Sequence, residues 1–416
     1  MAITLQLTDG TTTLTLSGGG SYGGCTYAPV PPAVSVLEDP DPQVSETAEV
    51  RIEGTETAIY AAWNAIEEML ALARRRQRTQ AGARVYLQYK THSGGTLYRS
   101  EVIDGSLPPA SDPKLRQARW GTVMAALTIT RRAWWEDAAE RTLATGSLTN
   151  NGASRLALGT PDGEIPAPVR LEITNTNAAA IWSEQIFACV NAFAAVGTID
   201  LTLPGGTINW SSALDMSQPY LEYDFSVAET QNLGGQRYWV LVGLDSATGN
   251  SYMRAALYNH IGAVKRVEAW SGEVYEGADA QIVALGPLPI PLTGQAGGAT
   301  GVMLALNLRD VSASPSGQLV ASWIQLMLAE SFRRLKQVGF QANNGDVWVD
   351  DGMVGETYML SGGVNRLAIL EGYGGPLMVY PGRANELMVV MDESGGVNAA
   401  RTMTATVIYR PRRLSV

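Results

Sequence analysis

The sequence predicts a mainly β protein, in which strands surround one flanking helix and are followed by a β-sandwich region. Two observations support this fold class. Short apolar runs, many of them alternating with polar residues, recur between turn residues along most of the 416-residue chain. Only one segment, residues 55–76, has the apolar spacing of a long amphipathic helix.

A β-hairpin is the first element that the sequence predicts. Residues 3–7 and 12–16 alternate apolar and polar side chains on either side of Asp9-Gly10, a favoured two-residue hairpin turn. Glycines at 18–20 and 23–24, followed by Pro29, Pro31 and Pro32, then predict a loop.

The helix is predicted over residues 55–76. Thr55 is a suitable N-cap, and the apolar residues after it recur at the spacing of one helix face. They are Ile59, Trp63, Ile66, Leu70 and Ala73. Arginines at 74, 75, 76 and 78 close the segment, where cations complement the helix dipole. This placement favours a solvated helix end over a surface that lines a lumen or touches DNA.

Further strands are expected on both sides of a turn-rich boundary at 145–165. Before it they are residues 44–52, 85–89, 97–102 and 120–129. After it they are residues 169–174, 199–203, 220–227, 238–244, 263–270, 319–328, 346–349, 367–370, 377–380, 387–391 and 402–409. Many short strands at this spacing are typical of a β-sandwich. The predicted division is 1–145, a linker and first strand at 146–175, a sandwich at 176–360, and closing strands at 361–416 that pack with the C-terminal region.

Composition limits the function classes. The formal net charge is −10, which disfavours direct binding to nucleic acid. Residues 1–150 carry 14 Lys or Arg and 16 Asp or Glu, so most of the negative charge lies in the remainder. Cys25 and Cys189 are too far apart to indicate a disulfide framework. The first residues have no basic n-region or apolar h-region, and no apolar stretch reaches 18 residues, so we expect neither a signal peptide nor a membrane span.

Two motifs of common enzymes occur in the sequence, but the residues around each do not predict the local structure that the motif needs. Gly18–Gly23 satisfies GxGxxG, but the prolines after it block the helix that a dinucleotide site needs. Ser111–Lys114 matches SxxK, yet Pro109 and Pro113 predict a loop there instead of a helix. We therefore expect no cofactor.

The titratable residues likewise do not predict a catalytic site or a metal-binding site. The two histidines, His92 and His260, fall in different predicted domains. Asp350 and Asp351 are the best adjacent carboxylates, but successive strand residues point to opposite faces. The tryptophans are mostly embedded in strand-like runs, which favours core positions over a sugar platform. The sequence predicts no enzyme and no catalytic, cofactor-binding or metal-binding residue.

The segment at residues 127–136 resembles a known family. Leu127-Thr-Ile-Thr-Arg-Arg-Ala-Trp-Trp-Glu136, together with the opening hairpin and the helix, resembles the first domain of distal tail proteins and related minor tail proteins of long-tailed, siphovirus-like phages. The resemblance implies a tail-tube-like β-barrel or sandwich that forms a sixfold ring, a hexamer, beneath the tail tube. A fragment ending near Gly146 is then expected to keep the assembly surface.

Three further segments carry resemblances, two of them to the same tail proteins and one to carbohydrate-binding modules. Residues 376–385 and 402–413 are similar to the final strands of such proteins. Gly345–Gly352 is similar to the closing strand of carbohydrate-binding jelly rolls, so residues 176–360 are expected to form a jelly roll like that of galectins or carbohydrate-binding modules. These segments imply an outward-facing sandwich behind the ring.

Three functions stay open from the sequence. The first is a structural component of a tail tip or baseplate, with the tail tube protein and the hub or fibre proteins as partners and the virion as its location after assembly in the host cytoplasm. The second is an adhesin of the same particle that binds a receptor or a host-surface glycan. The third is a carbohydrate-active hydrolase with β-sandwich modules.

Overall fold

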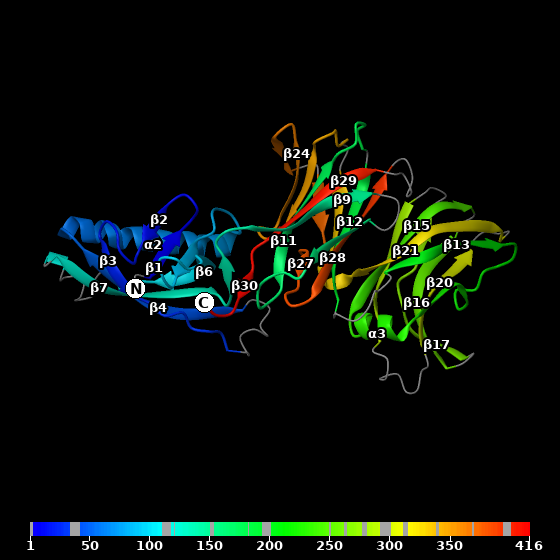
Figure 1. Cartoon of the computed structure of the whole chain (residues 1–416), viewed down its shortest axis with the longest axis horizontal. Helices are drawn as coiled ribbons and strands as arrows, with labels where there is room; N and C mark the ends of the chain where they lie inside the picture. Colours follow the sequence, from blue (N-terminus) through cyan, green and yellow to red (C-terminus); the bar gives the residue numbers. More distant parts are fainter. Residues whose placement is uncertain are drawn as a thin grey trace. The chain divides into compact units, whose positions relative to one another are not determined.

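The computed structural model describes residues 3–33, 42–109, 118–119, 121–149, 154–181, 183–193, 201–248, 251–261, 264–276, 281–291, 301–310, 315–337, 341–367, 370–393 and 401–416. The chain is mainly β, as the sequence predicts (Figure 1). Internal contacts divide it into two compact units. Unit 1 contains Met1–Glu140, Asp162–Ile165 and Arg410–Val416, and unit 2 contains Arg141–Pro161 and Pro166–Tyr409.

Unit 1 is built on one antiparallel sheet of nine strands. Seven of them follow the order β2-β1-β5-β6-β7-β4-β3, and β8 pairs with both β6 and β30. The strands are β1 (Thr4–Thr8), β2 (Thr13–Thr15), β3 (Tyr22–Thr26), β4 (Gln43–Glu53), β5 (Tyr86–Lys90), β6 (Tyr98–Ser106), β7 (Thr122–Arg132), β8 (Trp135–Asp137) and β30 (Arg412–Arg413). Neighbours far apart in sequence therefore complete one sheet.

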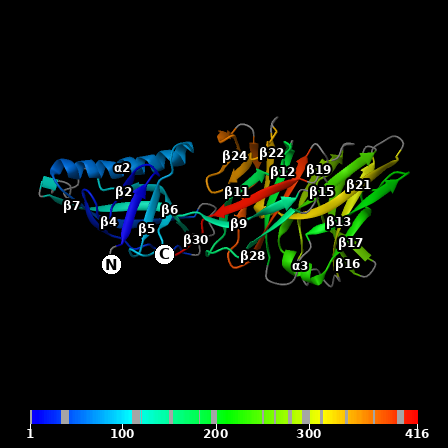
Figure 2. The same ribbon diagram turned by 45° about the horizontal axis from the view of Figure 1, so that its top comes forward.

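The helix α2 (Glu56–Thr79) lies across one face of this sheet (Figures 1 and 2). The Thr55 hydroxyl accepts the amide of Ala58, as the N-cap prediction requires, and the helix ends at Gln80 in the left-handed conformation, with φ of 55°. The predicted stripe, which is Ile59, Trp63, Ile66, Leu70 and Ala73, is buried in the core of unit 1. The helix prediction is confirmed, and α2 continues to Thr79.

The opening hairpin is also confirmed, but its turn is longer than predicted. Thr8 pairs with Thr13, so four residues connect β1 and β2 instead of two. The Asp9 carboxylate accepts the amides of Thr11 and Thr12 and stabilises this wider turn. Gly10 supplies a φ of 89°, which L-residues with side chains rarely adopt.

Unit 2 contains a first pair of sheets that encloses one hydrophobic core. One sheet has the order β10-β28-β12-β22-β26, and the other has β25-β24-β23-β11-β29-β9 with β27 beside β11. The strands are β9 (Arg141–Thr149), β10 (Ser154–Gly159), β11 (Ala167–Asn175), β12 (Ser183–Phe193), β22 (Phe332–Gln337), β23 (Val347–Asp351), β24 (Glu356–Ser361), β25 (Val364–Arg366), β26 (Leu370–Tyr373), β27 (Met378–Val379), β28 (Ala384–Glu393) and β29 (Thr402–Tyr409). The region at 146–175, expected to hold a linker and a first strand, contains β11 as that strand, and also β10 and the end of β9.

A second pair of sheets is formed by the residues between β12 and β22. The orders are β13-β21-β15-β19 and β14-β20-β16-β17, with β18 also on β16. The strands are β13 (Thr202–Trp210), β14 (Pro219–Phe225), β15 (Arg237–Thr248), β16 (Ser251–Ile261), β17 (Val264–Trp270), β18 (Val274–Glu276), β19 (Gln281–Pro289), β20 (Gly301–Asp310) and β21 (Gly317–Leu328). This second sandwich is thus an insertion in the first.

A short helix interrupts the predicted strand at 220–227. The strand β14 ends at Phe225, and α3 (Val227–Leu233) follows because Ser226 and Glu229 form a capping box. The Ser226 hydroxyl accepts the Glu229 amide, and the Glu229 carboxylate accepts the Ser226 amide in return. Both partners are visible in the sequence, and the prediction missed them.

Candidate interaction surfaces

Arg131, in the segment 127–136, is internal to unit 1. It is the residue before the last one of β7 and is fully buried against Glu46 of β4. Its Nε lies 2.9 Å from Glu46 Oε2 and its Nη2 lies 2.5 Å from Glu46 Oε1, which is a bidentate ion pair. The Tyr27 hydroxyl donates to the same carboxylate, and the Arg131 guanidinium lies 4.2 Å from the Trp135 ring centroid.

This arrangement assigns Arg131 a packing role. Burial and the adjacent Glu46 carboxylate raise the pKa of Tyr27, so its hydroxyl stays protonated and continues to donate. Trp135 is fully buried as well. Arg131 and Trp135 therefore lie in the core of unit 1 and not on its surface.

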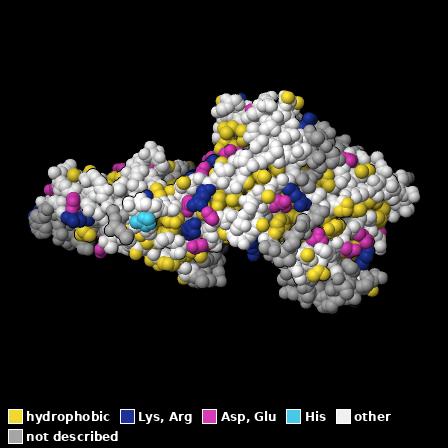
Figure 3. Space-filling view, in the orientation of Figure 1, with side chains coloured by type: hydrophobic (Ala, Val, Ile, Leu, Met, Phe, Trp, Pro, Cys, Tyr) yellow, Lys and Arg dark blue, Asp and Glu magenta, His cyan; other side chains and the backbone are white. Residues whose placement is uncertain are grey.

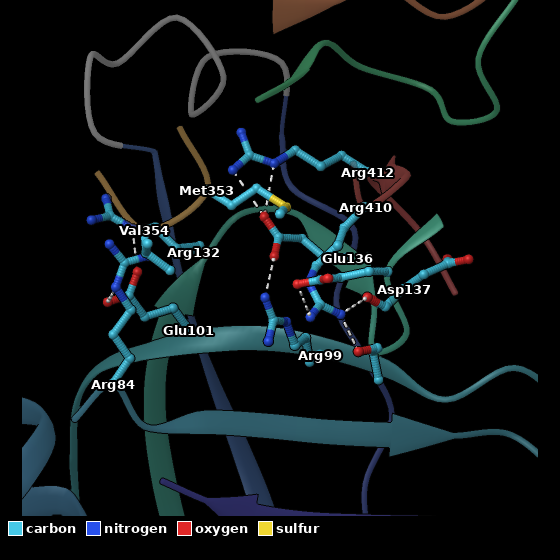
Figure 4. Close-up of polar contacts among 12 residues, drawn as sticks. Arg84, Arg99, Glu101, Arg132, Glu136, Asp137, Met353, Val354, Arg410 and Arg412 are labelled. Carbon is cyan, nitrogen blue, oxygen red and sulfur yellow. Dashed lines mark hydrogen bonds and ion pairs between the residues drawn. The ribbon is translucent and has the colours of Figure 1, made fainter. Parts of the chain in front are cut away.

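Glu136, the last residue of the segment 127–136, lies in an ion cluster at the edge of the sheet (Figure 4). Glu136 Oε1 accepts from Arg412 Nε at 2.9 Å, and Glu136 Oε2 accepts from Arg99 Nη2 at 3.4 Å. The Arg412 guanidinium lies 4.4 Å from the Trp134 ring centroid. Burial would raise the pKa of Glu136, but the guanidinium groups of Arg412 and Arg99 outweigh it, so this pKa lies below its ordinary value.

The seven-strand path of the sheet in unit 1 ends in two different strands, β2 and β3. In the described part of the chain, β2 pairs only with β1, and the one strand that pairs with β3 is β4. Such edges present main-chain N–H and C=O groups that can pair with another chain. Because the two edges differ, copies joined through them would meet head to tail, and head-to-tail contacts generate rings when the rotation closes.

A cavity of about 430 Å³ lies between α2 and the β1–β2 hairpin, beside the β2 edge. Leu14, Ala65, Met69 and Leu72 give it apolar walls. Asp9, Glu68 and Arg75 add charged groups of both signs to its lining. The hollow therefore offers apolar contact area next to an open strand edge.

Trp270 at the end of β17 is an exposed aromatic residue of unit 2. Its side chain is 57% exposed, and the Arg254 guanidinium lies 4.5 Å from its ring centroid. By contrast, Trp323 and Trp348 are buried in the sandwich cores, and Trp239 stacks on Phe332 at 5.3 Å, as expected for core positions. Trp270 is thus an exception to the sequence-based assignment of tryptophans to the core.

The glycine-rich motif forms turns, as predicted. Gly19 and Tyr22 form an isolated bridge, and the strand β3 follows, so no helix N-terminus is available for a phosphate. Ser111–Lys114 lies outside the described residues. His92 is exposed in a turn of unit 1, whereas the backbone of His260 belongs to β16 in unit 2. Within the residues described, no group of three or more His, Cys, Asp or Glu could hold a metal ion.

The two adjacent aspartates do different structural work. Asp350 accepts from Arg333 Nε at 2.9 Å and from the Thr357 hydroxyl, and its pKa is raised because burial outweighs the nearby Arg333. Asp351 accepts the amide of Met353 at 3.0 Å. The pair does not share a site.

Two residues of the arginine run at the end of α2 donate to main-chain carbonyls. Arg74 Nη1 donates to the Gly105 carbonyl at 2.5 Å, and Arg76 donates to the carbonyl of Gln80, which follows the last helical residue.

On the face shown in Figure 3, side chains of both charge signs lie close beside one another among polar and apolar ones. None of the helices in the described segments is both long and apolar enough to cross a membrane.

Comparisons with known proteins give no family for this chain. No protein-family model matches it, and no curated protein matches it. Among solved structures, it is similar to a chain of the phage P2 baseplate in its activated conformation with calcium, at 11% identity and a TM-score of 0.23, over 77% of this chain and 98% of the other. It is also similar to a protein from Parabacteroides distasonis, at 8% identity and a TM-score of 0.15, over 64% and 99% of the two chains. At these scores neither likeness carries an argument about function.

Proposed function

We propose that the chain is a structural component of a phage or phage-like tail tip, in which copies of unit 1 form a sixfold ring that joins the tail tube to the baseplate hub. Unit 2 is the outward β-sandwich region. The ring partners are further copies of the chain, the tube protein above it and the hub or fibre proteins below it.

The observation that carries the proposal is the pair of unlike open edges on the sheet of unit 1. A strand edge that another copy covers is an assembly surface, whereas an uncovered edge is an aggregation hazard. The resemblance of residues 127–136 to distal tail proteins supports the same role. Arg131 and Trp135 of this segment pack against each other in the core of unit 1.

The charge distribution supports placing unit 2 outside the ring. Unit 1 is nearly neutral, with 16 basic and 18 acidic side chains, so copies of it can approach closely. The remaining residues carry most of the net charge of −10, so crowding them around a narrow axis is unfavourable. Salt screens this repulsion beyond about 8 Å, so it biases the arrangement and does not fix it.

A lysine on the open edge tests the ring contact. Thr13→Lys places a charge on β2, where Thr13 is exposed, and lysine on an edge strand opposes pairing with another chain. The matched control is Thr11→Lys, in the exposed turn of the same hairpin. Native mass spectrometry and electron microscopy of the chain with its tube protein should show hexamers for the wild type and for T11K, and monomers for T13K.

A particle map tests the placement of the two units. Ring density at the end of the tube, with unit 2 pointing away from the axis, is the expected result. Should the sandwiches of unit 2 line the lumen while unit 1 projects outward, the two assigned roles would be reversed. A wild-type chain that stays monomeric with its tube protein would contradict the ring itself.

Trp270 supports a second candidate function, a receptor-binding or glycan-binding adhesin of the same particle. An exposed indole ring whose one face is held by Arg254 leaves apolar area on which a sugar ring can stack. If unit 2 binds the surface glycans of the host, Trp270→Ala should abolish retention on immobilised host cell-wall polysaccharide. Tyr373→Ala, at another exposed aromatic of unit 2, should not. Equal retention of both variants would remove Trp270 from the binding site.

We propose no catalytic role for the chain. The carboxylates singled out in the sequence, Asp350 and Asp351, are occupied by Arg333 and by turn amides. Turnover of a cell-wall glycan that a single carboxylate substitution abolishes would establish the hydrolase alternative instead.

A further inference from the structure

Residues 410–416 complete unit 1 although they follow unit 2 in the sequence. In β30, Arg412 pairs with Glu136 and Arg413 pairs with Trp135, so this strand covers the edge of β8. The Asp137 amide donates to the Pro411 carbonyl at 3.1 Å, and the Glu164 amide donates to the Arg412 carbonyl at 2.8 Å. The segment therefore lies between two other pieces of unit 1 and bonds to both.

The side chains of Arg410, Arg412 and Val416 hold the same segment. Arg410 donates to the Asp137 and Ala138 carbonyls and forms an ion pair with Glu140 at 3.1 Å. Arg412 joins Glu136 and stacks on Trp134, as Figure 4 shows for the ion pair. Val416 packs against the core of unit 1.

We propose that residues 410–416 act as a latch, so that unit 1 becomes competent for assembly only after this segment has closed on β8. The segment is translated after the whole of unit 2, so a chain that stops within unit 2 leaves the β8 edge open and Glu136 without Arg412. Such a chain lacks the closed form of unit 1 that we assign to the ring. This inference rests on the proposed function, since the ring is what the latch controls.

Charge reversal across the latch tests the inference in the full chain. Arg412→Glu places two carboxylates together, and Glu136→Arg gathers arginines around Arg99. Either variant should raise the hydrogen-exchange rate of the amides at 135–137 by about tenfold or more, because these amides exchange through local opening of β8. The double variant E136R/R412E restores opposite charges and should return exchange toward the wild-type rate. Arg78→Glu, at the exposed end of α2, is the matched control and should change neither.

Assembly is then measured on the same proteins. R412E should form at least tenfold fewer rings with the tube protein than the wild type, and the double variant should recover them. Unchanged exchange at 135–137 in R412E would show that β30 does not hold β8, whereas faster exchange with normal ring yield would show that assembly does not need the latch. A third outcome is that the wild type forms no ring while the amides at 135–137 still exchange faster in R412E. The proposed function and the control of assembly would then both be wrong. The closure of β30 on β8 would still be supported.

Discussion

Removing Arg131 should destabilise unit 1 more than almost any surface substitution could. Arg131→Met keeps much of the side-chain volume but leaves the Glu46 carboxylate in the core without its cation. Breaking a buried pair by removing one partner costs about 3 to 5 kcal/mol. For a unit of this size each kcal/mol lowers the unfolding midpoint by about 2 to 4 °C, which gives a decrease of about 6 to 20 °C.

A second substitution in this experiment, at Glu46, removes the carboxylate charge that R131M leaves without a cation. In E46Q/R131M, the oxygen of the new neutral amide can still accept from the Val30 amide, which lies 2.7 Å from Glu46 Oε1, while its NH2 group can donate to the Tyr27 hydroxyl, which in the wild type donates to Oε2. Most of the lost stability should return, because replacing both members of a buried pair is far less costly than replacing one. The control is Arg51→Met, whose side chain is 52% exposed and which should cost less than about 0.5 kcal/mol.

Thermal unfolding of the full chain, with hydrogen exchange on β4 and β7 to identify the transition of unit 1, is the suitable assay. The reasoning would be refuted if R131M lowered that transition no more than R51M does. The Arg131 guanidinium would then not be internal, and the packing role assigned to it would be wrong.

Three shorter predictions concern the same unit. Trp63→Ala should cost about 3 to 5 kcal/mol by chemical unfolding, since it empties the middle of the buried helix stripe. Gly105→Val should cost at least about 1 to 3 kcal/mol in the same assay, because a Cβ there would lie 2.8 Å from Leu70 of α2 and 2.7 Å from the backbone of β7. The pKa of Glu136 is lowered in the folded state, so its carboxylate stabilises unit 1 above pH 4.5 and this stabilisation is lost as pH falls through the folded-state value. A titration of stability should accordingly show a shallower acid loss for Glu136→Gln than for the wild type.

The sequence predicted well where one face of an element is buried and the other is not. The helix stripe from Ile59 to Ala73 and the alternating strand β4 are clear in the sequence because each has only one buried face. β12 was missed for the opposite reason. Its residues Ile186 and Ala188 pack into one core of unit 2 while Phe187 packs into the other. A strand buried on both faces reads as a continuous apolar run without a period of two.

The roles of the residues in the phrase 127–136 depend on partners that sequence patterns do not reveal. Arg131 is paired with Glu46, 85 residues earlier, and Glu136 is paired with Arg412, 276 residues later. No local rule connects such positions, because the pairing is set by the sheet order and not by spacing along the chain. For this reason the sequence predicted β30 to pack with the C-terminal region, whereas the structure pairs it with β8.

The same pairing changes what a fragment of this protein should do. A chain ending near Gly146, which the sequence suggested would keep the assembly surface, lacks Asp162–Ile165 and β30. A second fragment that joins residues 1–140, 162–165 and 410–416 through flexible glycine-serine linkers restores both. It should be more stable to urea by about 2 to 4 kcal/mol, from one charge-assisted pair and the recovered main-chain bonds on β8. It should also be the one that binds the tube protein. Equal unfolding midpoints for the two fragments would show that the strand after unit 2 adds nothing to unit 1, and that the first 146 residues carry its fold by themselves.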